Sequence, residues 1–532
     1  MVTIKIVRGI IMQRRVSKRH VALILVKIAL IFSMNLGFTD ESAAAGMFLG
    51  PYLQNPAKTR MTVMWITGSK SEGTVRYGTK ETLNHKVSVS STKNYIMSGK
   101  KGSGPTAYVY EAELADLKPG TVYQYEVSWE EVREKGSFRT IPDKPEPFTF
   151  IAYGDSRNGT KIHTKIASRF AKHNPAFILH TGDMIYGGNY AQWGPFFFEP
   201  LKGVISRFPL LPVIGNHEAG HERMGIIFNM PGGKTYYTFD YGDVHFICLN
   251  SGWEGMSRTR DLARQQLEWL RKHLPGCKAQ WKIVTYHRPT YDVGDHRSKW
   301  FRGEHLSLFR KYKVDLTITA HSHSYQRFCP MYKEDVNREH PITHIITAGG
   351  GAPLGGVNDD PHLAVGKNMY HYMVLKVDGN TLSGKVFSPE EEILDSFTIT
   401  KTGDSFDDAY LNQSLREEDF GKLRKGLSWI TLPEKPVPGK PFHVSLTLAS
   451  GSVQGAYEIQ IAERSEKYYK MEPVKGKIPA DTSVDVKLVI TANQEIKLKR
   501  VYLRPALVLK CSYDIAGNKG SIYSRQVSVK TK

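Results

Sequence analysis

The chain has few of the features that mark specialised protein classes. Its 532 residues include only four cysteines, at positions 248, 277, 329 and 511, and none of them belongs to a C-x-x-C pair. Zinc ribbons and dithiol redox motifs are therefore excluded. The sequence leaves one or two disulfides open in an oxidising compartment and does not assign them. Long runs of Lys and Arg, which mark nucleic-acid-binding arms, are also absent.

Beyond its first 45 residues, the sequence lacks any apolar run long enough to cross a bilayer. At the N-terminus, six basic residues precede the run VALILVKIALIFSMNLGF, and the small-residue stretch SAAAG follows it. This order is typical of a secretory leader that is cleaved after Ala45. An uncleaved membrane anchor is the alternative, which Lys27 within the apolar run disfavours. The sequence predicts a signal peptide over residues 1–45 and an exported protein, periplasmic or secreted.

Acidic residues are scarce relative to basic ones, and the formal net charge is +20. Removing residues 1–45, which carry seven basic and two acidic side chains, leaves +15. Such a surface attracts anions such as phosphate esters, nucleic acid or acidic polysaccharide. Charge alone indicates no specific nucleic-acid or membrane partner, and the oligomeric state stays open.

The length predicts roughly three domains of about 150 residues each. Residues 46–142 alternate in short β-like runs with frequent turns, which favours a small antiparallel β-sandwich. Residues 146–400 alternate buried strands with amphipathic helices, which indicates an α/β domain. Residues 401–428 are charged and irregular, as in a linker, and short alternating strands return over 429–532. We expect a third, all-β domain there, a β-sandwich without a chemical motif.

Polar residues follow five of the predicted strands in the α/β domain. Taken singly, an Asp after Gly is usually a turn residue, and a strand-end His is usually a hydrogen-bonded side chain. Ligands, however, bind beyond the carboxyl ends of the strands in an open α/β sheet, so five such endings indicate one shared site. The endings are Asp155 after FIAYG, Asp183 and Tyr186 in FILHTGDMIY, Asn216-His217-Glu218 after PVIG, His287 after IVTY, and His321 and His323 in LTITAHSH.

These residue types suit metal chemistry. Asp, Asn, His and a tyrosine oxygen are donors for Fe, Zn or Mn, and no cysteine takes part. A carboxylate shared by two ions about 3.5–4 Å apart allows activation of a water together with charge neutralisation on a phosphoryl group. The sequence therefore predicts a two-metal site.

The spaced set GD…GDxxY…GNHE…H…HxH resembles the purple acid phosphatase branch of the calcineurin-like metallophosphoesterases. The stretches GPYLQNPAKTRMTVMWIT and LADLKPGTVYQYEV are similar to the family's N-terminal fibronectin type III-like domain. SYQRF, HIITAGGGAPLG and VFSPEEEILDSFTI are similar to the end of its catalytic domain, so the resemblance spans roughly residues 47–400. It implies a central metallophosphoesterase sandwich of mixed sheets flanked by helices.

The resemblance also implies the metal ligands. A first ion, ferric iron in the family, would be bound by Asp155, Asp183, Tyr186 and His323. Asp183 would bridge to a second ion, which is Zn, Mn or Fe(II) in the family. The remaining ligands of that second ion would be Asn216, His287 and His321.

Four neighbouring residues complete the implied site. His217 would contact the phosphoryl oxygens or the leaving group, and His296 would protonate the leaving group. Glu218 would orient His217 or a water from behind the ligands. Arg157 stands where the family usually has glycine, and it either forks onto a substrate phosphate, pairs with an acid or points away.

Two smaller features accompany this set. Ala320 replaces the glycine that usually precedes the last histidine pair, and the sequon Asn158-Gly159-Thr160 is expected to be unused because a sugar would obstruct the cleft. Other histidines are expected to serve packing or to lie on the surface, namely His163, His173, His305, His340, His362 and His371.

The function implied is hydrolysis of a small phosphate monoester by a metal-bound hydroxide in an exported phosphatase. One alternative is a phosphodiesterase or nuclease with the same metal centre, which the positive charge mildly favours. A second is an exported binding protein with an inactive phosphatase fold. The complete set of seven ligands argues against that reading, although fold alone never proves activity.

Overall fold

The computed structural model describes most of the chain after residue 46. The described residues are 47–529 without 80–81, 97–105, 188–189, 219–220, 253–259, 297–300, 334–339, 429, 433, 450–453, 481, 496, 500–501, 505, 516 and 525–526. The predicted leader over 1–45 lies outside them. Among the described residues, no helix is both long and apolar enough to cross a membrane.

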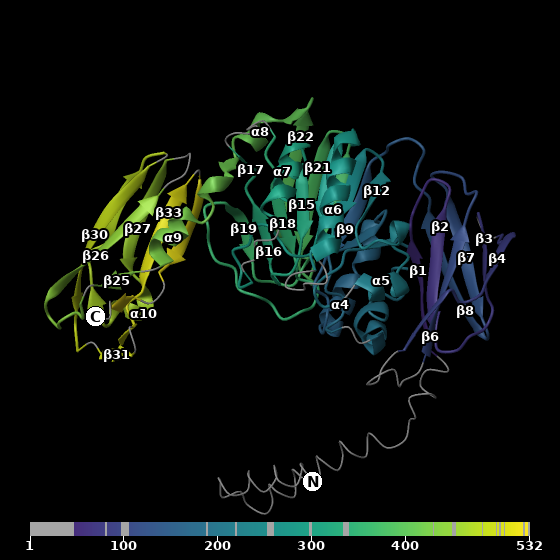
Figure 1. Cartoon of the computed structure of the whole chain (residues 1–532), viewed down its shortest axis with the longest axis horizontal. Helices are drawn as coiled ribbons and strands as arrows, with labels where there is room; N and C mark the ends of the chain where they lie inside the picture. Colours follow the sequence, from purple (N-terminus) through teal and green to yellow (C-terminus); the bar gives the residue numbers. More distant parts are fainter. Residues whose placement is uncertain are drawn as a thin grey trace, which may run out of the picture.

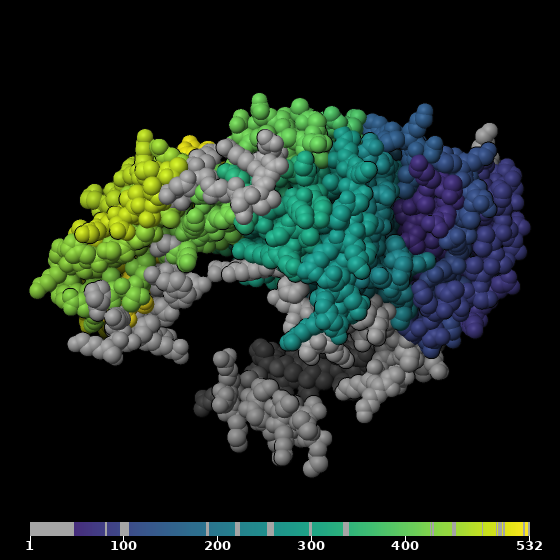
Figure 2. All heavy atoms as spheres, turned by 45° about the horizontal axis from the view of Figure 1, so that its top comes forward, coloured from purple at the N-terminus to yellow at the C-terminus, as the bar shows by residue number. Residues whose placement is uncertain are grey.

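The described chain is arranged as a row of three parts (Figures 1 and 2), with the N-terminal strands at one end and the C-terminal strands at the other. In the N-terminal part, two four-stranded sheets have the orders β1-β2-β6-β5 and β4-β3-β7-β8. Strand β2 is buried on both faces, because its residues alternate between the N-terminal core, which includes Trp65, and the central core, which includes Ile66. In the N-terminal core, Trp65 stacks on Tyr110 with 5.0 Å between ring centroids. The fibronectin-like assignment stays a prediction. The strands are β1 Phe48–Gln54, β2 Met61–Thr67, β3 Gly73–Gly78, β4 His85–Val89, β5 Lys93–Ile96, β6 Thr106–Leu114, β7 Val122–Trp129 and β8 Val132–Arg139.

Two seven-stranded mixed sheets form the central part. The first has the order β11-β10-β9-β20-β21-β22-β23, in which β9, β10 and β11 run parallel. Its strands are β9 Phe148–Tyr153, β10 Ile178–His180, β11 Leu210–Pro212, β20 Tyr372–Asp378, β21 Thr381–Phe387, β22 Ile393–Thr402 and β23 Ser405–Phe406.

The second sheet has the order β12-β13-β14-β15-β18-β16-β19, in which β13, β14, β15 and β18 run parallel. Its strands are β12 Tyr237–Tyr241, β13 Val244–Cys248, β14 Trp281–Thr285, β15 Leu316–Thr319, β16 Tyr325–Phe328, β18 Thr343–Thr347 and β19 Leu363–Lys367.

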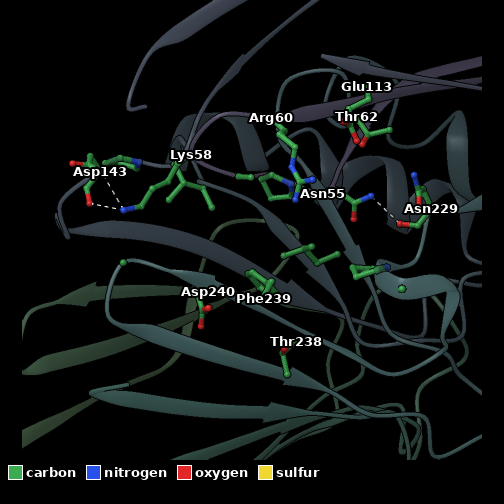
Figure 3. A pocket seen from close by; sticks show the side chains of 18 of the residues that line it. Asn55, Lys58, Arg60, Thr62, Glu113, Asp143, Asn229, Thr238, Phe239 and Asp240 are labelled. Carbon is green, nitrogen blue, oxygen red and sulfur yellow. Dashed lines mark hydrogen bonds and ion pairs between the residues drawn. The ribbon is translucent and has the colours of Figure 1, made fainter. Parts of the chain in front are cut away.

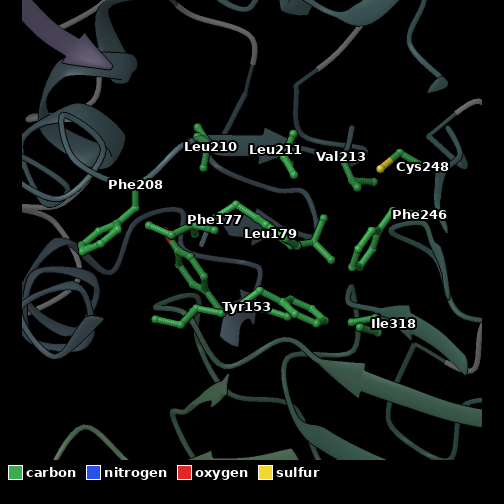
Figure 4. Packing of buried hydrophobic residues seen from close by; sticks show 14 of the residues in the cluster. Tyr153, Phe177, Leu179, Phe208, Leu210, Leu211, Val213, Phe246, Cys248 and Ile318 are labelled. Carbon is green, nitrogen blue, oxygen red and sulfur yellow. The ribbon is translucent and has the colours of Figure 1, made fainter. Parts of the chain in front are cut away.

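The two sheets face each other across an aromatic core. Figure 4 shows Phe177 and Leu179 of the first sheet directed toward Phe246 and Cys248 of the second. The ring centroids of Phe177 and Phe246 lie 5.2 Å apart in an edge-on arrangement. Because neighbouring strand residues point to opposite faces, Ile247 packs instead beneath the outer helices.

Helices cover the outer faces of both sheets. Leu270 of α6 and Leu306 and Phe309 of α7 pack on the second sheet, and α4 packs on the first. This arrangement is the mixed-sheet sandwich flanked by helices that the sequence implies. The helices are α4 Thr160–Ala167, α5 His221–Ile227, α6 Arg260–His273 and α7 Glu304–Lys311.

Residues 401–428 are structured, so the prediction of an irregular linker was wrong. The segment forms β23, α8 (Asp408–Leu411), β24 (Leu415–Arg416) and α9 (Lys422–Ser428), and β24 pairs with β17 (Met331–Tyr332) of the central part. Tyr410 enters the central core, whereas Leu423 and Leu427 enter the C-terminal core. These few apolar side chains anchor the segment to both cores. The high overall charge of the segment gave no indication of these anchors.

In the C-terminal part, the described residues form mainly strands. Three sheets have the orders β26-β30-β28, β29-β27-β33-β34 and β25-β35-β32-β31. All four cysteines of the chain are unpaired. The elements are β25 Thr431–Leu432, β26 Pro441–Ala449, β27 Gly455–Ile461, α10 Glu463–Glu466, β28 Tyr469–Lys470, β29 Val474–Ile478, β30 Ser483–Ala492, β31 Lys497–Lys499, β32 Tyr502–Arg504, β33 Leu509–Ile515, β34 Asn518–Tyr523 and β35 Ser528–Val529.

Candidate metal centre

The candidate ligands lie in sharp turns at the carboxyl ends of parallel strands from both sheets. Asp155, Asp183 and Asn216 follow β9, β10 and β11, and the ligand histidines follow β14 and β15. Asp155, Asp183, His321 and His323 have φ values of 55°, 58°, 73° and 48°. Such left-handed backbone is unfavourable for residues other than glycine and concentrates at functional sites. The turns thus direct these side chains toward a common point.

Five of these residues form two groups that share one carboxylate. Asp155, Asp183 and His323 make the first group, and Asp183, His287 and His321 make the second. Within each group the ligand atoms lie within 4.8 Å of one another, and all five side chains are buried. This geometry fits two ions bridged by Asp183.

In the second group, His287 presents its Nε2 atom to the site. Its Nδ1 lies 2.9 Å from the carbonyl oxygen of Thr181, so Nδ1–H donates there and Nε2 faces the other ligands. Nε2 lies 3.3 Å from Asp183 Oδ1 and 3.1 Å from Asn216 Oδ1. The structure therefore brings Asn216 to this group, as predicted.

The first group contains a buried oxygen that lacks a donor. His323 Nδ1 donates to the carbonyl of Pro353 at 2.8 Å, and its Nε2 lies 3.3 Å from Asp155 Oδ1. Asp155 Oδ2 accepts a hydrogen bond from the backbone of His321 at 2.8 Å, while Oδ1 has no hydrogen-bond partner among the described residues. A buried carboxylate oxygen in this position suits a bound cation. The donor set therefore fits a dinuclear metal centre.

Charge within the site is balanced between carboxylates and imidazoles. Burial opposes ionisation of Asp183, yet the neighbouring His287 holds the pKa of its carboxyl well below the ordinary value. Burial likewise disfavours the cationic form of His287, but Asp183 and Asp155 raise its pKa to about 9. The carboxylates thus favour a positive charge at this point, which the imidazolium of His287 or a bound cation can supply.

Glu218 connects two of the turns that carry candidate ligands. Its buried carboxylate accepts hydrogen bonds from three backbone amides, those of Asp183 at 3.2 Å, Met184 at 2.6 Å and Gly215 at 2.6 Å. It therefore holds the turn after β10 against the turn after β11. The expectation that it orients His217 or a water stays a prediction.

His217 and Tyr186 lie together at the mouth of the site. The backbone of His217 donates to Asp183 Oδ1 at 3.0 Å, and its Nε2 is 3.8 Å from Asp183 Oδ2. Its ring stacks on that of Tyr186 with 5.4 Å between centroids. Tyr186 is 52% exposed, and its hydroxyl makes no hydrogen bond to the described residues. Its ring is thus placed beside the ligands, facing outward.

Arg157 lies inside the site. Its Nε is 3.4 Å from Asp183 Oδ2, and its Nη2 is 3.2 Å from His323 Nε2. The guanidinium carbon lies 5.5 Å from the centroid of the Tyr186 ring. Of the alternatives that the sequence left open, the structure shows Arg157 paired with an acid, Asp183.

His296 reaches the site from the loop after β14. Its ring centroid is 4.6 Å from that of His321 and 5.1 Å from that of His323. The structure therefore brings this histidine to the ligands. Several of the other histidines serve packing, as expected; His163, for example, is buried and bonded to the Tyr153 hydroxyl at 2.9 Å.

Sequence reasoning missed one support of the ligands, the turn after β18. The amide of Ala352 donates to the carbonyl of Asp155 at 2.7 Å, and the carbonyl of Pro353 accepts from His323. The run Gly349-Gly350-Gly351 was the sequence feature that could have indicated this close packing of the turn against the site. A Cβ atom at Gly350 would lie 2.5 Å from the carbonyl oxygen of Gly154, so only glycine allows this close approach.

A separate cavity of about 640 Å³ lies between the N-terminal and central parts (Figure 3). Asn55, Lys58, Arg60, Asn229 and Asp240 are among its lining residues. None of the candidate metal ligands lines it. The candidate metal centre therefore lies outside this cavity.

Comparison with known proteins points to one family. Residues 148–325 match the calcineurin-like phosphoesterase family, and residues 50–140 match the purple acid phosphatase N-terminal domain. Neither match reaches the C-terminal part. The chain is 26% identical over 324 residues to probable purple acid phosphatase 20 of Arabidopsis thaliana. The aligned region covers 56% of this chain and 72% of that relative.

Two further relatives and one solved structure agree. Acid phosphatase type 7 of Mus musculus is 27% identical over 56% of this chain and 76% of its own length. Probable inactive purple acid phosphatase 1 of Arabidopsis thaliana is 25% identical, over 64% of this chain and 67% of its own length. A purple acid phosphatase from yellow lupin seeds has the same fold, with a TM-score of 0.56 and 20% identity over 69% of this chain and 76% of that one.

Proposed function

We propose that this chain, a metal-dependent phosphatase of the purple acid phosphatase-like branch of the calcineurin-like metallophosphoesterases, hydrolyses small phosphate monoesters after export. The observation that carries this proposal is the position of Asp183 in both ligand groups. A shared carboxylate holds two cations close enough to act on one phosphoryl group.

The two ions are assigned by their donors. Asp155, Asp183, Tyr186 and His323 are proposed to bind Fe(III), and Asp183, Asn216, His287 and His321 to bind Zn, Mn or Fe(II). Oxygen and nitrogen donors without sulfur support these hard and borderline metals. For Tyr186, the assignment requires the hydroxyl to turn inward from the stack on His217. When bound, the two ions polarise the phosphoryl group and lower the pKa of a water.

The chain's own residues bind and orient the ester. Arg157 has its guanidinium beside Asp183 and His323, so two of its donors can fork onto phosphoryl oxygens that arrive there. The Nε2 atom of His217 faces the same side of Asp183 and supplies a further donor. His296, against the rings of His321 and His323, is proposed to give its proton to the leaving oxygen.

A monoester suits this arrangement better than a diester. A monoester dianion offers three non-bridging oxygens and carries more charge, which two cations, Arg157 and His217 together can neutralise. The positive net charge of the chain supports anionic substrates of either kind. Turnover of p-nitrophenyl phosphate should therefore exceed that of bis(p-nitrophenyl) phosphate. A reversed preference would favour the phosphodiesterase.

The decisive experiment is the visible absorption spectrum of the purified protein together with its metal content. A tyrosinate-to-ferric charge-transfer band that disappears in Tyr186→Phe would support both the iron and its ligand. If the protein is active but contains no iron and lacks the band, the phosphatase proposal stands and the assignment of Fe(III) is wrong. Neither metal nor turnover would favour an inactive binding protein, a state that the name of one relative indicates for that relative.

A further inference from the structure

One extended segment, residues 352–360, begins at the metal centre. The amide of Ala352 donates to the carbonyl of Asp155 at 2.7 Å. The carbonyl of Pro353 accepts from His323 Nδ1 at 2.8 Å, and the amide of Gly355 donates to the carbonyl of His323 at 2.9 Å. The start of this connecting segment therefore holds two of the proposed ligands in place.

The middle of the connecting segment pairs with the loop that carries His296. The amide of Gly356 donates to Asp295 Oδ2 at 2.6 Å. The backbone and side-chain nitrogens of Asn358 both donate to the carbonyl of Val293, at 3.1 and 2.6 Å. His296 is the next residue after this paired stretch, so the connecting segment fixes the point from which its side chain projects.

The far end of the connecting segment contacts the C-terminal part. The amide of Ser521 in β34 donates to Asp359 Oδ2 at 2.7 Å, and the guanidinium of Arg424 in α9 donates to the carbonyl of Asp359. A Cβ atom at Gly520 would lie 3.0 Å from Asp359 Oδ2, which shows how closely β34 approaches. Arg424 belongs to the C-terminal unit, since Leu427 of the same helix packs in its core.

We propose that the C-terminal domain positions the leaving-group side of the metal centre, with Asp359 as the positioning residue that couples the two. The connecting segment is held at both ends, by the metal centre and by the C-terminal domain, so it has fewer conformations. The loop that carries His296 pairs with this segment, and a proton donor works only when it is held in line with the leaving oxygen. Asp359 touches neither substrate nor ions; it acts through Asn358, Gly356 and the 293–295 loop on His296. The leaving-group role rests on the proposed function.

The test compares substrates that differ in their need for a proton. In Asp359→Ala, kcat for an alkyl phosphate such as glycerol phosphate should fall roughly tenfold, because a general acid contributes a hundredfold or more. For p-nitrophenyl phosphate, whose leaving group departs without a proton, kcat should stay within about twofold. Metal content and both KM values should not change. Asp359→Asn, which keeps an acceptor oxygen for Ser521, should restore most of the loss.

Two controls make the result specific. Asp485 lies in the same domain, away from the connecting segment, and its carboxylate accepts a hydrogen bond from Thr447 at 2.7 Å. Asp485→Ala should leave kcat for both substrates unchanged. In a His296→Ala background, Asp359→Ala should cause no further loss, since the two changes act through one group. Equal loss on both substrates, no loss on either, or fully additive effects would overturn the proposal.

Hydrogen exchange provides a readout that does not depend on turnover. Amides of residues 291–296 should exchange faster in Asp359→Ala than in the unaltered protein and in Asp485→Ala. If the unaltered protein hydrolyses no phosphate ester, the proposed function fails, and this measurement still decides whether the C-terminal domain holds the loop. Unchanged exchange in residues 291–296 would refute the coupling.

Discussion

The carboxylate of Glu218 lies 2.6 Å from the backbone nitrogens of both Met184 and Gly215, and so connects two turns that carry proposed metal ligands. One of its oxygens accepts from Met184, and the other accepts from the amides of Asp183 and Gly215. The glutamate of the GNHE motif therefore supports the backbone of the site from within.

Replacing Glu218 should weaken metal binding more than it weakens chemistry in the loaded enzyme. Glu218→Ala leaves three buried amides without acceptors, at a cost of about 1–3 kcal/mol each, and releases the turn after β10. Metal affinity should fall roughly 10–100-fold, as for other outer supports of ligands. Elemental analysis after dialysis and thermal unfolding check this. Full metal content with slowed turnover would instead support a role on His217 or a water.

The shared position of Asp183 predicts an unequal loss of ions. Asp183→Asn should remove both ions, because the residue belongs to both groups, whereas His287→Ala and His323→Ala should each remove about one. Counting bound ions per chain by elemental analysis distinguishes these outcomes. Asp240→Asn, at an exposed carboxylate outside the centre, is the matched control and should keep both ions. One ion left in Asp183→Asn would argue against bridging.

Arg157 should matter for phosphate more than for folding. Its guanidinium contacts Asp183 and His323, and we expect Arg157→Met to weaken competitive inhibition by inorganic phosphate about tenfold, which corresponds to one charge-assisted hydrogen bond. Inhibition constants measured at fixed metal loading test this. Unchanged phosphate affinity with tighter metal binding would mean that Arg157 competes with an ion for these two residues.

Stability should decline in acid through buried histidines outside the centre. Burial lowers the pKa of His344 to about 3, while an unfolded histidine titrates near 6.5. Between these two values the unfolded chain binds a proton that the folded chain refuses, so the free energy of unfolding falls as pH falls. The slope is at most about 1.4 kcal/mol per pH unit for this group, and its contribution is complete above pH 6.5.

Denaturant unfolding between pH 7 and 4 measures this effect. His344→Phe, which keeps an aromatic ring against Tyr291, should lose less stability across that window than the unaltered protein. His443→Phe, on the exposed face of β26, serves as the control and should follow the unaltered protein. Parallel curves for the unaltered protein and His344→Phe would contradict the expectation.

Much of the site could be predicted because it depends on where strands end. Asp155, Asp183, Asn216 and His287 follow buried apolar runs, and parallel strands deliver such residues to one edge whatever the details of packing. The sequence does not fix where a long side chain turns afterwards. Arg157 could be assigned to the site only once its contacts with Asp183 and His323 were seen.

Other features depend on contacts between distant segments. The three amides that donate to Glu218 come from two turns. A local sequence pattern predicts a helix or a turn, but it does not predict that two turns contact the same side chain. Likewise, Tyr410 and Leu427 are single apolar residues in a charged stretch, and only the two cores that they enter explain why 401–428 is ordered. Composition averages over such anchors and so predicted a linker.

The left-handed turns at Asp155, Asp183, His321 and His323 also bear on metal exchange. Each costs on the order of 1 kcal/mol or more and persists because the surrounding sheets hold it. We therefore expect these turns to keep their backbone conformation whichever metal is bound. One metal should replace another without refolding, so that colour, rate and acid tolerance become properties of the metal supplied while the protein architecture stays the same.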